Sequence, residues 1–152
     1  MTSEAGKAMG DPGDPFGLER FVAAQDRGGT YGRALAEIRA GEKESHWMWF
    51  IFPQVAGLGR SPMAQEYAIS SAAEARGYLA HPVLGPRLAE CAAALLTVEG
   101  KSAQDIFGPV DAMKLRSSIT LFQAVAGPDE VLSAVMQKFF GGIPDDATLA
   151  RL

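Results

Sequence analysis

Three polar residues on one predicted amphipathic helix offer the clearest chemistry in this sequence. Asp111, Lys114 and Ser118 fall within about 60° of one another on a helical wheel, in the sector that also holds Leu115 and Phe122. Polar groups stranded on a buried face are costly. We therefore expect these side chains to pair with partners or to line a cavity, where a carboxylate and an ammonium could act on a ligand. The structural alternative is that Asp111 caps the helix and Lys114 extends to solvent.

The segment from Ser45 to Gln54 holds both tryptophans of the chain, in the run Ser-His-Trp-Met-Trp-Phe-Ile-Phe-Pro-Gln. Trp47 and Trp49 cannot share one face of a helix, because residues two apart point about 200° apart. One is expected in the core, and the other could stack on a base or a nicotinamide-like ring. The competing interpretation makes the whole run core. Residues 47–52 suit a strand or a helical turn, and we favour helix because no other segment offers a partner strand.

The loop that follows combines glycines with an arginine, reading Gln-Val-Ala-Gly-Leu-Gly-Arg over residues 54–60. It leads into a predicted helix start, and helix N-termini together with an arginine can hold an anion. Gln54 and Arg60 are therefore candidate ligand-binding residues. The loop is not a Walker motif, since the Gly-Lys-Ser/Thr element is missing. An ordinary turn is the structural alternative.

Other familiar chemistries lack their residue patterns. His46 and His81 lie far apart in the sequence, and no His-x-x-x-His or Cys-x-x-Cys is present, so we expect no metal ion and no cofactor. The single cysteine, Cys91, cannot form an intramolecular disulfide, and it shares a helix face with leucines, which indicates core. The sequence contains no Gly-x-Ser-x-Gly element, so nothing in it indicates a serine hydrolase.

Composition indicates one globular domain without a general affinity for polyanions. The chain has 152 residues, 47% hydrophobic and 21% charged, which is enough to bury a core without disulfides. A net charge of -4 argues against general binding of nucleic acid or anionic membranes, which needs a basic footprint. No apolar run is long enough to span a bilayer and no secretory signal is evident, so the cytoplasm is the expected location. The oligomeric state is left open.

The positions of glycine and proline predict two parts of the chain. Residues 1–15 are expected to form a flexible leader, and residues 16–152 a single helical domain. Alanine-rich amphipathic segments with clear stops predict an all-α fold of about seven or eight short helices. Ser71 with Glu74 predicts a capping box, and Asp145 is expected to cap a last turn. The expected helices include residues 31–40, 71–80, 102–107, 111–126 and 128–140. On the wheel of residues 111–126, the side chains expected to face solvent are Arg116, Thr120 and Gln123.

Several motifs resemble those of a bacterial family. The run from His46 to Gln54, the Gly-Leu-Gly-Arg-Ser of 57–61, the His-Pro-Val-Leu-Gly of 81–85 and the segment 111–122 look like the domain-of-unknown-function family 1810. The resemblance covers about residue 16 to the end, and it implies a compact helical domain. Some members carry the label calpastatin, but calpastatins are disordered repeat inhibitors and this chain is neither disordered nor repetitive.

A more distant similarity is to the NADAR domains, helical N-glycosidases that act on ADP-ribose or ribosyl-phosphate derivatives. The shared features are an aromatic-rich helix early in the chain and an amphipathic helix with polar residues late in it. The similarity implies a catalytic glutamate, for which Glu44 is the nearest counterpart, two residues before His46.

These features support the hypothesis that the protein binds, or cleaves at an N-glycosidic bond, a small nucleotide-like or phosphate-bearing ligand of the ADP-ribose type. A non-enzymatic protein-interaction module is the alternative, and it predicts an exposed apolar patch without a polar pocket. The predicted site comprises Asp111, Lys114 and Glu44 as catalytic residues and Trp47, Trp49, Gln54, Arg60 and Ser118 as ligand-binding residues.

Overall fold

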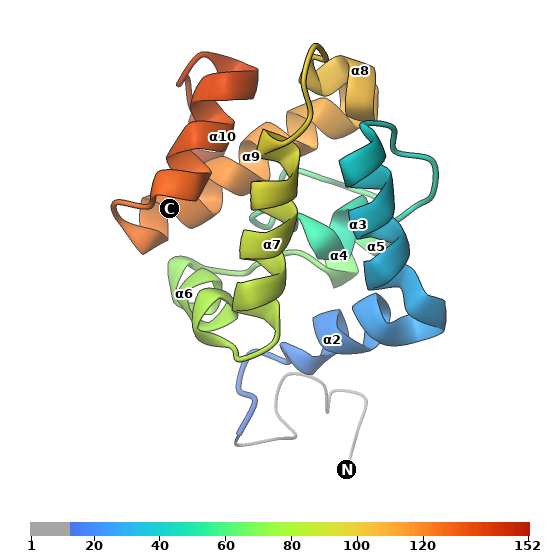
Figure 1. The fold of residues 1–152 in the computed structure, drawn as a ribbon. Helices are drawn as coiled ribbons and strands as arrows, with labels where there is room; N and C mark the ends of the chain where they lie inside the picture. Colours follow the sequence, from blue (N-terminus) through green and yellow to red (C-terminus); the bar gives the residue numbers. More distant parts are fainter. Residues whose placement is uncertain (1–12) are drawn as a thin grey trace.

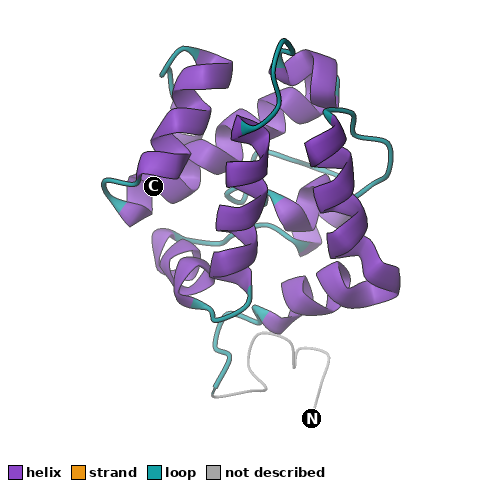
Figure 2. Cartoon of the chain, in the orientation of Figure 1, coloured by secondary structure: helices purple, strands orange, loops and turns teal. Residues whose placement is uncertain are grey.

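Alanine-rich segments separated by glycine stops form helices throughout the computed structural model, which describes residues 13–152 (Figures 1 and 2). The all-α class is confirmed: the described residues form no strand, only an isolated parallel bridge between Val55 and Ile69. The expected leader lies outside the described residues except for 13–15. In chain order the helices are α2 (Glu19–Asp26), the 3-10 turn η1 (Arg27–Gly29), α3 (Thr30–Ala40), α4 (Met48–Ile51), α5 (Pro62–Glu66), α6 (Ala72–Ala80), α7 (Leu84–Leu96), α8 (Ala103–Phe107), α9 (Pro109–Ala126), α10 (Glu130–Phe140) and α11 (Asp146–Leu149).

Side-chain caps start several of these helices, as the sequence indicates. Asp145 accepts the Thr148 N–H at the start of α11, which confirms the expected last cap. At α6 the expected capping box is only half formed. The Ser71 hydroxyl accepts the Glu74 N–H, but the Glu74 carboxylate accepts hydrogen bonds from Ser70 instead of reaching back to the cap residue. Glu74 also forms an ion pair with Arg20 of α2, and this ion pair sets the direction in which the Glu74 carboxylate points.

Helix α9 runs behind α7 through the middle of the fold and packs against α6, α8, α10 and α11 (Figure 1). The prediction that Thr120 faces solvent is wrong: it is only 2% exposed. Its hydroxyl accepts the Asp145 N–H and donates to the Arg116 carbonyl. Asp145 also accepts a hydrogen bond from the Ser117 hydroxyl. A helical wheel assumes one buried face, whereas the turn that carries α11 covers the opposite side of α9 as well.

The aromatic run forms α4, a single helical turn, so the helical interpretation of residues 47–52 is confirmed over the strand. Trp47, Met48, Ile51 and Phe52 are at most 2% exposed. The bridge between residues 55 and 69 lies beyond this turn and leaves it without a partner strand among the described residues. The most apolar segment of the chain therefore lies in the core, where its burial contributes most.

Arg20 on α2 ties the first helix to the connection between α5 and α6. Its guanidinium donates to the carbonyls of Glu66 and Ala68 and pairs with Glu74 at 3.0 Å. The arginine and glutamate side chains are only 12% and 3% exposed. A buried charge pair of this kind is stable only when its remaining donors are bonded, and the carbonyls bond them here. The contact fixes the backbone on both sides of Tyr67.

Within residues 13–152, no helix combines the length and the apolar character needed to cross a membrane.

Candidate functional site

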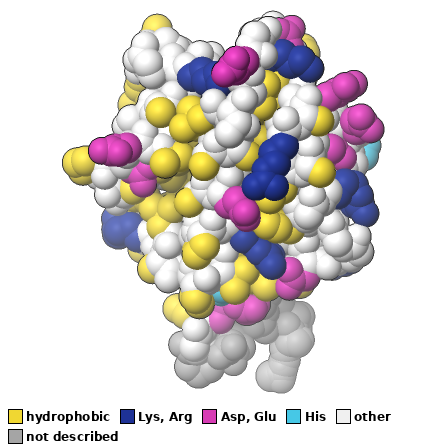
Figure 3. All heavy atoms as spheres, viewed as in Figure 1, with side chains coloured by type: hydrophobic (Ala, Val, Ile, Leu, Met, Phe, Trp, Pro, Cys, Tyr) yellow, Lys and Arg dark blue, Asp and Glu magenta, His cyan; other side chains and the backbone are white. Residues whose placement is uncertain are grey.

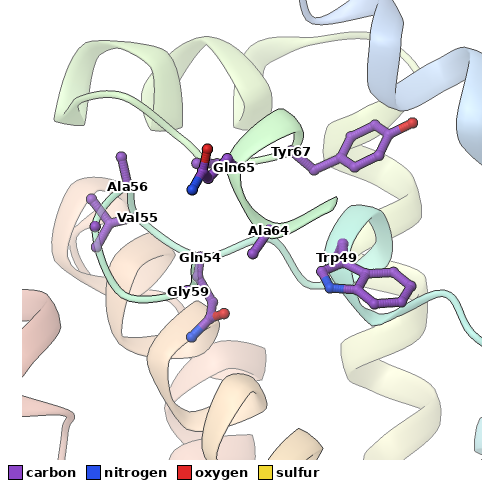
Figure 4. Close-up of a pocket in the computed structure, with 10 residues that line it drawn as sticks. Trp49, Gln54, Val55, Ala56, Gly59, Ala64, Gln65 and Tyr67 are labelled. Carbon is purple, nitrogen blue, oxygen red and sulfur yellow. The ribbon is translucent and has the colours of Figure 1, made fainter. Parts of the chain in front are cut away.

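Trp49 forms part of the wall of a cavity of about 150 Å³ next to the glycine-containing loop (Figure 4). Gln54 comes from the same stretch of chain, and the opposite wall comes from α5 and the residues after it. The two tryptophans separate as expected, because Trp47 is fully buried while Trp49 is partly exposed. The cavity is lined by Trp49, Gln54, Val55, Ala56, Gly57, Gly59, Ala64, Gln65, Tyr67 and Ala68.

A charged cluster lies beside Trp49. The Lys114 ammonium is 5.4 Å from the centroid of the Trp49 ring and 3.6 Å from an Asp111 carboxylate oxygen. The other Asp111 oxygen is 3.0 Å from the Lys43 ammonium, which itself lies 5.0 Å from the Trp47 ring centroid. Two ammonium groups thus share one carboxylate. Of the two, Lys114 is the one beside the Trp49 ring.

The start of α9 explains where Asp111 points. Pro109 occupies the first helical position and Gly108, which has no side chain, is the cap residue. Asp111 therefore lies inside the first turn of α9. The structural alternative, in which Asp111 caps this helix, is wrong. Lys43 lies opposite Asp111, and its backbone N–H donates a hydrogen bond to the Ile106 carbonyl. The Lys43 side chain is only 9% exposed. The cluster is built from a loop and a helix that are far apart in the sequence.

Glu37 is a carboxylate of this region that the sequence reasoning did not select. It accepts hydrogen bonds from the backbone N–H groups of Glu44 and Ser45, the Ser45 hydroxyl and the Trp47 indole N–H. Burial opposes ionisation of Glu37, but these donors outweigh it and lower the pKa of Glu37 from 4.5 to about 2. It fixes the 41–47 loop and the Trp47 ring. Nothing in the sequence signalled this role, because no spacing rule pairs Glu37 with Ser45 across a loop.

Glu44, predicted as a catalytic residue, has an exposed side chain. Its part in the arrangement is its backbone N–H, which donates to Glu37 at 2.8 Å. The carboxylate that contacts the Trp47 indole is therefore that of Glu37, and the carboxylate that pairs with Lys114 beside Trp49 is that of Asp111.

Arg60 and the two glycines of the 54–60 loop differ in their position relative to the cavity. Gly57 and Gly59 line the cavity, whereas the Arg60 side chain is exposed and does not line it; the Arg60 carbonyl accepts a hydrogen bond from Gln65. Instead, the guanidinium of Arg151, which follows α11, lies against Gly57. A Cβ on Gly57 would be 2.5 Å from an Arg151 guanidinium nitrogen, and the φ of +97° also requires glycine there. No short-range pattern could connect residue 57 with residue 151.

Ser118 lies one helical turn beyond Lys114 on α9 and is fully buried. Its hydroxyl has no hydrogen-bond partner among the described residues, although Ser117 and Thr120 bond back to carbonyls four residues earlier. Such an unbonded buried hydroxyl is uncommon. Ser118 does not line the cavity, so the structure does not bring it together with Trp49 and Gln54.

Cys91 lies in the core of the fold. Burial raises the pKa of the Cys91 thiol to about 12, which suits a core residue and not a nucleophile. Among residues 13–152 no three side chains of His, Cys, Asp or Glu gather as potential metal ligands.

Two comparisons with known proteins relate the chain to others. A family model described as "Protein of unknown function (DUF1810)" matches residues 15–152. A solved structure of a conserved hypothetical protein from Mycobacterium tuberculosis is similar with a TM-score of 0.87 and 48% sequence identity. That match covers 93% of this chain and 98% of the other. The search of curated proteins found no match.

Proposed function

The chain belongs to the DUF1810 family, and we propose that it binds a small ligand carrying a planar ring and an anionic group at the Trp49 cavity. The observation that carries this proposal is the position of the Lys114 ammonium, 5.4 Å from the ring centroid of a tryptophan that also lines the cavity. An aromatic face stacks on a planar ring, and a nearby ammonium attracts phosphate or carboxylate. We place this activity in the cytoplasm.

The volume of the cavity limits the size of the ligand group that can enter it. A volume of about 150 Å³ is close to that of an engineered cavity that holds a benzene ring, about 150 Å³. Sites for complete drug-sized ligands are larger, roughly 300–1,000 Å³. One ring or one phosphate therefore enters the cavity, and the rest of a nucleotide-like ligand lies along the 54–60 loop.

Charge supports an anionic ligand. The Lys114 ammonium lies beside Trp49 and shares the Asp111 carboxylate with Lys43, so it can attract a negative group of the ligand. The Arg151 guanidinium lies against Gly57, on the loop that lines the cavity. Guanidinium groups bind phosphate with two parallel hydrogen bonds, and no acidic partner of Arg151 is found among the described residues.

Within this proposal, hydrolysis of an N-glycosidic bond is the reaction we assign. In this proposal Asp111, which pairs with Lys114 but does not itself line the cavity, orients a water molecule for attack on the anomeric carbon, and Lys114 stabilises negative charge on the ligand. A bond forms between the water oxygen and the anomeric carbon as the bond from that carbon to the base nitrogen breaks. The proton that the water loses passes through solvent to the departing base, on which Trp49 stacks.

Titration with ADP-ribose, AMP and ribose 5-phosphate tests the binding step, with thermal unfolding and calorimetry as readouts. A ligand that binds the native state must raise the melting temperature. We expect Trp49→Leu and Lys114→Gln each to weaken binding by at least about tenfold, the loss of one stacking or charge-assisted contact. The matched control Arg39→Gln, at an exposed arginine of α3, should bind normally. Absence of stabilisation by all three ligands at millimolar concentration would contradict the proposal.

Protein interaction is a second candidate, favoured by one observation. Among residues 13–152, the most exposed large apolar side chains are Met113, Val110 and Ile143, at 72%, 65% and 60% exposure. Arg116 on α9 links two parts of this face by donating to the Ile143 carbonyl. Exposed apolar groups that gather on one face are typical of an interface. This candidate predicts that no ligand in the titration stabilises the protein, and that Met113→Gln disrupts a complex without altering the fold.

A further inference from the structure

A larger hollow lies where α6, α7 and the junction of α9 and α10 meet, and it shares no residue with the Trp49 cavity. Its volume is about 500 Å³. Figure 3 shows hydrophobic side chains gathered on this face of the molecule. The walls are mainly apolar and include Leu79, Leu88, Val125, Val131 and Leu132.

The packing of α6 against α7 shapes one wall of this hollow. Gly85, in the first turn of α7, lies so close to α6 that an added Cβ would overlap the Leu79 carbonyl oxygen. Glycine therefore lets the two helices approach and bring Leu79 and Leu88 to the same wall. The hollow is a fixed feature of helix packing rather than a gap between mobile loops.

Two charged residues, Arg76 and Asp129, border the hollow, and they differ in what already binds them. Asp129 caps α10 by accepting the Leu132 N–H at 2.9 Å, and the positive end of that helix offsets its charge. Arg76 is exposed, and no hydrogen bond or ion pair of its guanidinium is found among residues 13–152. The uncompensated charge beside the apolar walls is therefore positive.

We propose that this hollow binds an amphiphilic anion, a medium-chain alkyl carboxylate, with its chain on the apolar walls and its carboxylate on Arg76. The volume falls within the range of small-molecule sites, roughly 300–1,000 Å³. Burial of the chain supplies affinity, and the guanidinium selects the head group, because it pairs with a carboxylate through two hydrogen bonds. The site is independent of the Trp49 cavity and of the ligand proposed there.

Calorimetric titration of the full chain with hexanoate, octanoate and decanoate tests the chain subsite. Each buried methylene should strengthen binding by up to about fourfold until the walls are filled. Ala89→Trp places a large side chain into the hollow from an exposed position and should abolish binding of decanoate. Trp49→Leu should leave it unchanged, which separates this site from the proposed function.

The head-group subsite is tested by Arg76→Gln, with Arg39→Gln as the matched control. We expect Arg76→Gln to weaken decanoate binding at least about tenfold, the loss of a charge-assisted pair, and the control to have no effect. Decyltrimethylammonium, which has the same chain length and the opposite charge, should bind the native protein far more weakly than decanoate.

Several results would overturn the proposal. Equal binding of decanoate and decyltrimethylammonium, or an Arg76→Gln variant that binds decanoate normally, would show that charge does not select the occupant. No binding of any alkyl carboxylate would exclude the site altogether. A dimer in sedimentation experiments that Ala89→Trp dissociates would show that the hollow receives a second copy of the chain instead. If Ala89→Trp fails to fold, the chain-length series and Arg76→Gln still decide the question.

Discussion

Trp47 and Trp49, separated by one residue, lie in contrasting surroundings. Trp47 is fully buried, and Glu37 accepts a hydrogen bond from its indole N–H at 2.8 Å. Trp49 is partly exposed, lines a cavity and lies near the Lys114 ammonium. The Trp47 indole N–H and the Glu37 carboxylate bond each other, whereas the Trp49 ring borders a cavity and has the Lys114 ammonium beside it. A region whose polar groups already bond one another stabilises the fold. A region whose charged groups lie beside a cavity is a candidate for ligand binding.

The carboxylates on the two sides differ in the same way. Glu37 accepts four hydrogen bonds from a loop and an indole, which leaves little room for a ligand. Asp111 contacts only two ammonium groups and its side chain is 22% exposed. The first carboxylate therefore organises the loop, and the second is accessible for chemistry.

Replacing each tryptophan gives the largest expected contrast. Trp47→Ala should lower the free energy of unfolding by about 3–5 kcal/mol, because it leaves a cavity in the core. Trp49→Ala should cost only about 1–2 kcal/mol, since part of its surface already faces solvent. Urea denaturation of both variants measures the difference. Equal losses would show that Trp49 is as much a core residue as Trp47.

Glu37→Gln should lower the free energy of unfolding by about 1.5–3 kcal/mol, the usual effect of losing hydrogen bonds to a charged group. The near-ultraviolet circular dichroism of the tryptophans should also change, because the Trp47 ring loses its partner. Glu44→Gln is the matched control, with an exposed side chain and no expected effect. A destabilised Glu44→Gln variant would mean that its carboxylate has a partner in solution.

The pH dependence of stability follows from the lowered pKa of Glu37, about 2 against an ordinary 4.5. The unfolded chain binds the proton more tightly, so the stabilisation is fully present above about pH 4.5 and is lost as the pH falls toward 2. The pKa values of Asp105 and Asp145 are lowered too, by bonds to Ser102 and, against the effect of burial, to Thr148. The difference between the native protein and Glu37→Gln isolates the Glu37 contribution. Parallel stability curves for the two proteins in this range would contradict the assignment.

The smallest effects are expected on α9, next to the charged cluster. Ser118→Ala removes a buried hydroxyl without a partner, so stability should stay constant or rise by up to about 1 kcal/mol. Thr120→Val removes a hydroxyl that bonds Asp145 and Arg116, and it should cost about 1 kcal/mol. Thermal unfolding of the pair measures the contrast. A loss on Ser118→Ala would reveal a water or ligand bound to that hydroxyl.

Sequence reasoning was most successful where the controlling contact is local. Helix starts at Ser102 and Asp145 were predictable because a cap bonds an N–H only three residues away. The different burial of Trp47 and Trp49 agrees with the expectation, although Trp47 is the residue before the helical turn and not part of it. The prediction failed at Thr120, because a helical wheel shows which residues share a face but not how many faces are covered.

The candidate site was predictable only in part. Asp111 and Lys114 were selected because they interrupt an apolar face, and Trp49 because it cannot share a face with Trp47. Glu37 and Arg151 were missed, since each reaches the site through a loop or from the end of the chain. Arg60 was chosen from its loop sequence, but its side chain does not line the cavity.

The sequence by itself determined the helical class, the helix ends and which residues could carry charge or stack on a ring. Those features depend on hydrogen bonds and steric limits within a few residues of the chain. Only the tertiary structure decided that Lys43 meets Asp111, that Arg20 meets Glu74 and that Arg151 rests on Gly57. Such pairings depend on how whole helices pack, because burial of apolar surface and pairing of buried charges are satisfied across the entire fold at once.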